Sequence, residues 1–147
     1  MGFGSLRVNK VNDDMAEVFV YGDIGGWMDG IGADEFAREL KSLKVTEITA
    51  RINSGGGSVF EGQAIYNSLV NHPAKVNVVI DGIAASIASL IAMAGDNISI
   101  TEGSHIMVHK PWSMAMGDAN SMRKEDEVLD SLESGIIDIY AARTGKS

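Results

Sequence analysis

Apolar segments alternate with polar, glycine-containing segments along most of the chain, and this pattern predicts alternating strands and helices. The β-branched run at 75–81 and the segment 47–52 are typical of strands, and two further strands are predicted before them and two short ones after them. Helices are predicted over residues 33–43, 60–71, 88–94 and 118–143. Alternating strands and helices favour right-handed crossovers. The fold class predicted is therefore α/β, with a mainly parallel sheet and helices packed around it.

The last predicted helix, at about 118–143, carries an apolar stripe. The stripe residues stand three or four positions apart and are Met122, Leu129, Leu132, Ile136, Ile139 and Tyr140. An apolar stripe of this kind is normally buried against another element. It either packs on its own domain or contacts another subunit, and the sequence leaves both open.

Ser86 lies between small residues, where the predicted strand at 75–81 passes into a short helix. Backbone N–H groups at a helix N-terminus have no partner within the helix and favour developing negative charge. A serine at this position therefore suits acyl transfer as a nucleophile. The alternative is that Ser86 only caps the helix, because serine is a common N-cap residue.

Two further segments add chemistry at predicted strand ends. Residues 53–59 contain three consecutive glycines, whose backbone N–H groups can approach a ligand closely and serve an oxyanion or a phosphate. His109 stands near the end of a strand predicted at 104–111, 23 residues beyond Ser86. Strand ends that border one crevice of an open parallel sheet are where sites form. A nucleophile, a base and an oxyanion donor are thus all present.

Three of these segments resemble motifs of the Clp-type serine peptidases. Residues 53–59 are similar to that family's Asn-Ser-Pro-Gly-Gly-Ser-Val turn, with Gly55 in place of the proline. Residues 82–86 resemble its Gly-x-Ala-Ala-Ser nucleophile segment. Residues 106–111 resemble its Met-x-x-His-x-Pro base segment. Several motifs in the right order make the resemblance specific, although each alone is weak.

Other segments resemble the branch of this family found as phage head-maturation proteases. They are residues 22–27, 109–112 and 140–145, and the whole resemblance runs from about residue 18 to 145. It implies a Clp/crotonase-type fold of repeated β-α units, in which the long C-terminal helix is a handle through which subunits meet.

The resemblance also implies roles for individual residues. Ser86 would be the nucleophile and His109 the general base, which takes the serine proton and later protonates the leaving amine. The backbone N–H groups of Gly57 and Ile87 would form the oxyanion hole. Elementary geometry agrees for Ile87, since it directly follows Ser86 at the start of the predicted helix.

The third member of the triad is where the chain departs from the family. In Clp-type peptidases the aspartate that orients the histidine follows the long helix, and no residue here matches it. The resemblance thus predicts that the chain ends before this aspartate and that its activity is weak. Asp118 and Asp81 are close in sequence to the site, but we predict a helix cap and a strand-end surface charge for them.

The predicted function is therefore that of a serine endopeptidase that cleaves polypeptides through an acyl-enzyme. The family implies a self-compartmentalising homo-oligomeric ring, with unfolded chains from an ATPase unfoldase or phage capsid and scaffold proteins as substrates. One alternative is a weak or inactive assembly subunit of the same fold. Another is a crotonase-type enzyme acting on acyl-coenzyme A, which the motif contexts of Ser86 and His109 disfavour.

Composition narrows the remaining classes. With 147 residues, 45% of them hydrophobic, the chain fits a single domain over residues 1–147. It has no cysteine, and its histidines show no metal-ligand spacing, so neither a metal nor a cofactor is predicted. The net charge of −8 argues against nucleic acid as a partner. No apolar run approaches the ~20 residues of a membrane span, and the expected location is the cytoplasm of a bacterial or phage-infected cell, or a procapsid.

Overall fold

The computed structural model describes residues 5–26 and 30–146. It divides the chain into two compact units, Met1–Val108 and His109–Ser147. Trp27, in the segment that resembles the phage enzymes, lies outside the described residues. The single domain expected over residues 1–147 stays a prediction.

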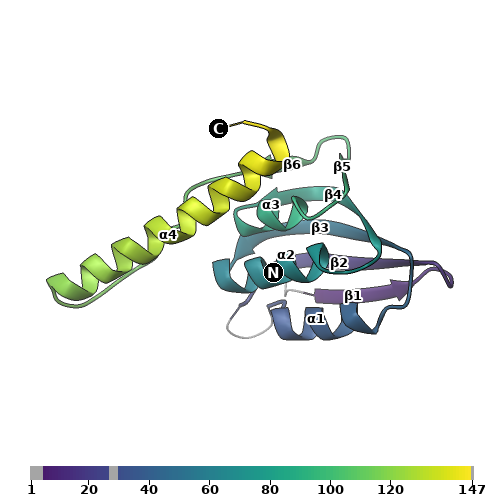
Figure 1. Ribbon diagram of the computed structural model, residues 1–147, viewed down its shortest axis with the longest axis horizontal. Helices are drawn as coiled ribbons and strands as arrows, with labels where there is room; N and C mark the ends of the chain where they lie inside the picture. The colour runs from purple at the N-terminus through teal and green to yellow at the C-terminus, as the bar shows by residue number, and fades with distance from the viewer. Residues whose placement is uncertain (1–4, 27–29, 147) are drawn as a thin grey trace. The chain divides into compact units, whose positions relative to one another are not determined.

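The first unit is built on a sheet that has six strands within the described residues (Figure 1). The strands are β1 (Ser5–Lys10), β2 (Met15–Ile24), β3 (Glu47–Gly57), β4 (Lys75–Ala85), β5 (Asn97–Ile100) and β6 (His105–Met107). The helices of this unit are α1 (Ala33–Ser42), α2 (Val59–Val70) and α3 (Ile87–Ala92). The strand order is β1-β2-β3-β4-β5, with β6 also beside β4. Only β1 pairs in the antiparallel sense among the described strands, so the predicted α/β class with a mainly parallel sheet is confirmed.

The core lies between one face of the sheet and the three helices. Alternate residues of the three central strands are buried, as period-two side-chain alternation requires. They include Val18, Val20, Ile48, Ile52, Val78 and Ile80. Phe36 of α1, Ile65 of α2 and Leu90 of α3 are also fully buried, and Figure 1 shows these helices along the same side of the sheet. This packing fixes the ends of β3 and β4, where the candidate site lies.

Two strands continue further than their sequence pattern predicts. β3 extends through the glycines to Gly57 and β4 extends to Ala85, because neighbouring strands continue to pair with them. Ile24 pairs with Gly57, and Ser54 pairs with Ala84. The register of both ladders shifts just before these pairs, as at a β-bulge.

The strand predicted at 104–111 is wrong in its length. β6 contains only His105–Met107, which pair with Ile83, Ala84 and Ala85. Since β4 ends at Ala85, it offers no further ladder for the residues after Met107. His109 therefore lies beyond β6 rather than within the end of a strand.

The second unit contains the long helix α4 (Ala119–Thr144), as predicted. Asp118 caps it by accepting a hydrogen bond from the Ser121 N–H at 2.9 Å. The segment before the helix runs along it: Lys110 Nζ lies 2.7 Å from Glu133 Oε1, and the Ser113 hydroxyl donates to Glu125. None of the described helices is long and apolar enough to cross a membrane.

Candidate active site

Ser86 has an unusual backbone at the junction of β4 and α3. Its φ of 54° and ψ of −129° make it the one positive-φ residue other than glycine in the described part of the chain. A side chain at such a φ is strained, and strain of this kind persists where the surrounding structure imposes it, often at functional sites. Ser86 takes the N-cap position of α3 but its side chain makes no capping hydrogen bond, so helix capping does not explain the residue.

Hydrogen bonds on both sides hold this strained turn in place. The Ser86 N–H donates to the Met107 carbonyl of β6 at 2.9 Å. The Ser86 carbonyl accepts from both the N–H and the hydroxyl of Ser89, which is fully buried. A serine on a tight strand-to-helix turn is the arrangement by which several hydrolases present a nucleophile.

The glycine segment Gly55–Gly57, which ends β3 and is called the glycine turn here, lies directly against Ser86. Gly56 has a φ of +100°, and a Cβ added to it would lie 2.7 Å from the Ser86 Cβ and 3.3 Å from the Ile87 nitrogen. Gly57 has a φ of +145°, and its Cβ would lie 2.1 Å from the carbonyl oxygen of Ile24. Side chains are thus excluded at both positions. The structure brings Ser86 and Ile87 close to the glycine turn that contains Gly57.

His109, the predicted general base, is the first residue of the second unit. Asp118 serves as the α4 cap, in agreement with the sequence, and its hydrogen bonds with Ser121 lower the pKa of the carboxyl group. Among the described residues, no three His, Cys, Asp or Glu side chains are grouped as the ligands of a metal ion would be.

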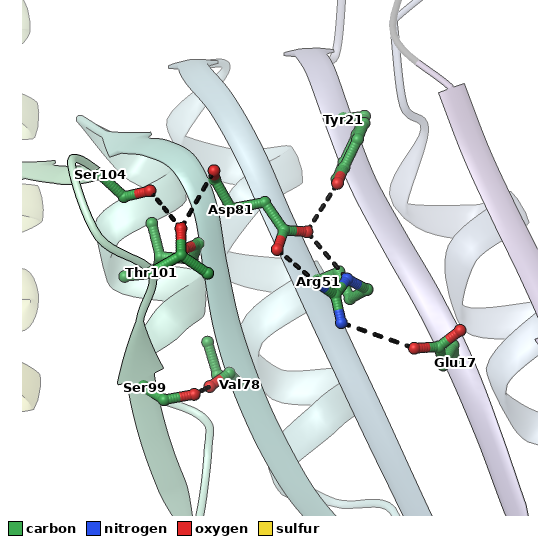
Figure 2. Close-up of polar contacts among 9 residues, drawn as sticks. Glu17, Tyr21, Arg51, Val78, Asp81, Ser99, Thr101 and Ser104 are labelled. Carbon is green, nitrogen blue, oxygen red and sulfur yellow. Dashed lines mark hydrogen bonds and ion pairs between the residues drawn. The ribbon is translucent and has the colours of Figure 1, made fainter.

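The strand-end surface charge predicted for Asp81 is wrong. Figure 2 shows the Asp81 carboxylate between Arg51 of β3 and Tyr21 of β2. Arg51 donates to it through Nε at 2.9 Å and Nη2 at 2.5 Å, and the Tyr21 hydroxyl donates at 2.6 Å. Arg51 also lies 3.6 Å from Glu17. These pairs join three strands just before the segment that carries Ser86, and the hydrogen bond with Asp81 raises the pKa of Arg51.

The same cluster predicts a pH dependence. Burial, followed by the hydrogen bond to Asp81, raises the pKa of Tyr21 above its ordinary value. A raised pKa in the folded state means that the protonated Tyr21 hydroxyl contributes to the stability of the fold. An unfolded tyrosine ionises near pH 10, so this contribution is fully present below about pH 10. It is lost as the pH rises through the folded-state pKa of Tyr21. We expect one of the three tyrosines to titrate late in an absorbance titration of tyrosinate, and Tyr21→Phe to remove that component. A late component that survives in Tyr21→Phe would contradict this.

The family model described as Clp protease matches residues 23–147 of this chain, which include the glycine turn, Ser86 and His109. This chain belongs to the Clp protease family. The Clp-type resemblance of the sequence motifs is thereby confirmed, whereas the phage branch stays a proposal.

Individual Clp relatives agree with this assignment. The chain is 30% identical over 128 residues to the ATP-dependent Clp protease proteolytic subunit 1 of Protochlamydia amoebophila, covering 82% of this chain and 62% of the relative. It is 36% identical over 98 residues to the proteolytic subunit of Pleurastrum terricola, covering 65% of this chain and 50% of the relative. The chain thus spans half to somewhat under two thirds of these relatives. The solved structure of a ClpP1 N165D mutant from Listeria monocytogenes is similar with a TM-score of 0.76 and 26% identity, covering 89% of this chain and 73% of that one.

Proposed function

We propose that the protein is a serine endopeptidase that cleaves polypeptides through an acyl-enzyme on Ser86. The observation that carries this proposal is the strained φ of 54° at Ser86, held by hydrogen bonds and placed against a glycine turn. Strain at a serine that caps nothing is expected where a fold presents a nucleophile. The relatives are named as proteolytic subunits of ATP-dependent Clp proteases, which supports the same reaction.

In the proposed reaction the Ser86 Oγ attacks the scissile carbonyl carbon while His109 takes its proton. The oxyanion accepts hydrogen bonds from the N–H groups of Gly57 and Ile87. The C–N bond then breaks, and the proton passes from His109 to the leaving amine. Water, deprotonated by His109, then attacks the carbonyl carbon of the ester. The bond to Ser86 Oγ breaks, the Oγ takes the proton back from His109, and the carboxylic acid product leaves.

Chain connectivity supports His109 as the base. Met107 pairs with Ala85, and its carbonyl accepts the Ser86 N–H at 2.9 Å. Because two residues span at most about 7 Å, the Cα of His109 stays within that distance of the Met107 Cα. Asp81 and Asp118, the nearest aspartates in sequence to the two proposed catalytic residues, are already engaged by Arg51 and Ser121.

A matched pair of histidine variants tests this function. A fluorophosphonate should phosphonylate the full chain at Ser86, mapped by peptide mass, and His109→Ala should lower the labelling rate by at least about 100-fold. His105→Ala, an exposed histidine on β6, should label at the wild-type rate. Equal loss in both variants would contradict the role of His109. No labelling of folded wild-type protein would instead favour a non-catalytic assembly subunit.

We also propose that the chain acts as a homo-oligomer. Apolar side chains of the second unit face solvent: Trp112 is 71% exposed, Met114 92% and Met116 97%. No residue of α4 is fully buried within the described chain, although the helix carries the apolar stripe that includes Leu132. Exposed apolar surface of this kind marks an interaction site. The proposed ring would enclose the active sites and admit unfolded polypeptides.

Sedimentation across a concentration series checks this association. Leu132→Asp should weaken it by at least about tenfold, or 1.4 kcal/mol, because a charge enters the apolar stripe. Ser131→Asp adds the same charge at the neighbouring exposed position and should leave the association unchanged. A wild-type protein that stays monomeric at high concentration would show that the stripe is satisfied within one subunit, and Leu132→Asp would then destabilise the fold.

Two sources of polypeptide substrate fit this chemistry, and only one of them requires an ATPase partner. The relatives are named ATP-dependent, which supports unfolded chains delivered by an ATPase in the cytoplasm. The segments at 22–27, 109–112 and 140–145 support a phage enzyme that processes capsid or scaffold protein in an infected cell or procapsid. We favour the second source, since the segments at 22–27 and 140–145 lie outside the shared catalytic motifs at 53–59, 82–86 and 106–111. Cleavage of a folded scaffold protein without ATPase or nucleotide would support it.

A further inference from the structure

Ser54 is a buried polar residue on β3, close to the glycine turn. It is 1% exposed, and only one other polar side chain, Ser89, is as fully buried within the described residues. The alternation of β3 points Ser54 to the same face as the core residues Ile48 and Ile52. A hydroxyl at such a position costs free energy unless it is hydrogen-bonded, so its partners indicate its role.

The Ser54 hydroxyl uses both its donor and an acceptor lone pair. It donates to the carbonyl oxygen of Gly22 at 2.6 Å and accepts from the Gly56 N–H at 3.1 Å. Gly22 has a φ of 87° and stands where the β2–β3 register shifts. The extra residue of this bulge is on β3, where Ser54 and Gly55 together stand opposite Gly22, and the Ser54 hydroxyl gives the Gly22 carbonyl a hydrogen-bond partner. One hydroxyl thus ties Gly22 of β2 to the glycine turn of β3.

This link reaches the reacting groups through a short chain of contacts. Gly56 lies against Ser86 so closely that an added Cβ would be 2.7 Å from the Ser86 Cβ. Gly56 also directly precedes Gly57, the proposed oxyanion donor. A misplacement of about 1 Å at a reacting group can lower a rate about 100-fold, so the peptide plane between these glycines must be held accurately.

We propose that Ser54 is a positioning residue for the oxyanion hole, an inference that rests on the proposed function of Ser86 and Gly57. Its hydroxyl fixes the Gly56 N–H and thereby the orientation of the peptide unit that leads to Gly57. Because Ser54 is 1% exposed, its role is to position the glycines rather than to contact substrate. Removing its hydroxyl leaves the Gly22 carbonyl and the Gly56 N–H without this partner, and the turn reorients to satisfy them.

Kinetics of Ser54→Ala test the proposal on the full chain. With a small activated ester, we expect kcat and the rate of Ser86 phosphonylation to fall about 10- to 100-fold, while KM stays within about twofold. The matched control is Ser99→Ala, an exposed serine of β5 whose hydroxyl also donates to a strand carbonyl, that of Val78 at 3.2 Å. A folded Ser54→Ala with wild-type kcat, or with a change in KM alone, would overturn the proposal.

Amide hydrogen exchange separates this inference from the proposed function. The Gly56 N–H should be protected in the wild-type protein and should exchange at least about tenfold faster in Ser54→Ala, whereas core amides such as that of Ile52 should not change. If the wild-type protein shows no reaction that depends on Ser86, the proposed function fails, and unchanged Gly56 exchange would overturn the role of Ser54 as well. If Ser54→Ala does not fold, an unprotected Gly56 N–H in the wild-type protein overturns it.

Discussion

Ser86→Ala is expected to lower hydrolysis of an unfolded polypeptide or a small activated ester by about 100-fold or more, because no acyl-enzyme can form without the nucleophile. The variant should remain folded. Since alanine at φ 54° carries the same backbone strain as serine, its free energy of unfolding should change by less than about 1 kcal/mol. Initial rates and thermal unfolding, measured on the same preparations, check both statements.

The control for this variant is Ser68→Ala. Ser68 is an α2 serine whose hydroxyl donates to its own helix at the Ala64 carbonyl, remote in the chain from the site. It should hydrolyse both substrates at the wild-type rate. Hydrolysis that persists in Ser86→Ala would mean that another group is the nucleophile.

Gly57→Ala is expected to destabilise the fold by at least about 3 kcal/mol, enough to unfold much of a marginally stable domain. The added Cβ would lie 2.1 Å from the Ile24 oxygen, an atom of the backbone that pairs with Gly57 itself. Neither partner can rotate away without breaking the end of the β2–β3 ladder. The φ of +145° adds strain for any residue with a side chain. Denaturant unfolding measures the change.

Gly55→Ala is the natural comparison, since it makes the same chemical change two residues earlier. A Cβ at Gly55 would meet nothing within 4 Å, and the residue is exposed. We expect its free energy of unfolding to stay within about 0.5 kcal/mol of wild type. Equal destabilisation by both substitutions would show that the effect does not come from the contact of Gly57 with β2.

The elements that the sequence predicts best are those with a strong local pattern. The run at 75–81 and the stripe of α4 each contain enough repeats to define their period, and both elements appear where expected. The ends of strands were predicted less well. Residues 53–57 suggest a turn by composition, yet they extend β3 because Ile24 pairs with Gly57 across the ladder. Such pairing depends on partners about 30 residues away and leaves no local signal.

The Asp81 cluster was missed for a related reason. Tyr21, Arg51 and Asp81 each stand next to a buried apolar residue on their own strand, so alternation places all three on the face opposite the core. Alternation does not say which residues are level with one another across three strands. The parallel registers supply this, and only the structure fixes them. A search for opposite charges on equivalent strand faces would have suggested the pair.

The positive φ at Ser86 places the proposed catalysis and the stability of the fold in competition at a single residue. Glycine would adopt this conformation without steric penalty, and a side chain there costs roughly 1 kcal/mol or more. A lineage selected only for a durable fold would therefore drift to glycine at position 86. Position 86 is serine, although the chain has 17 glycines. Selection for a chemical role at this position would explain why serine is kept there despite its cost to stability.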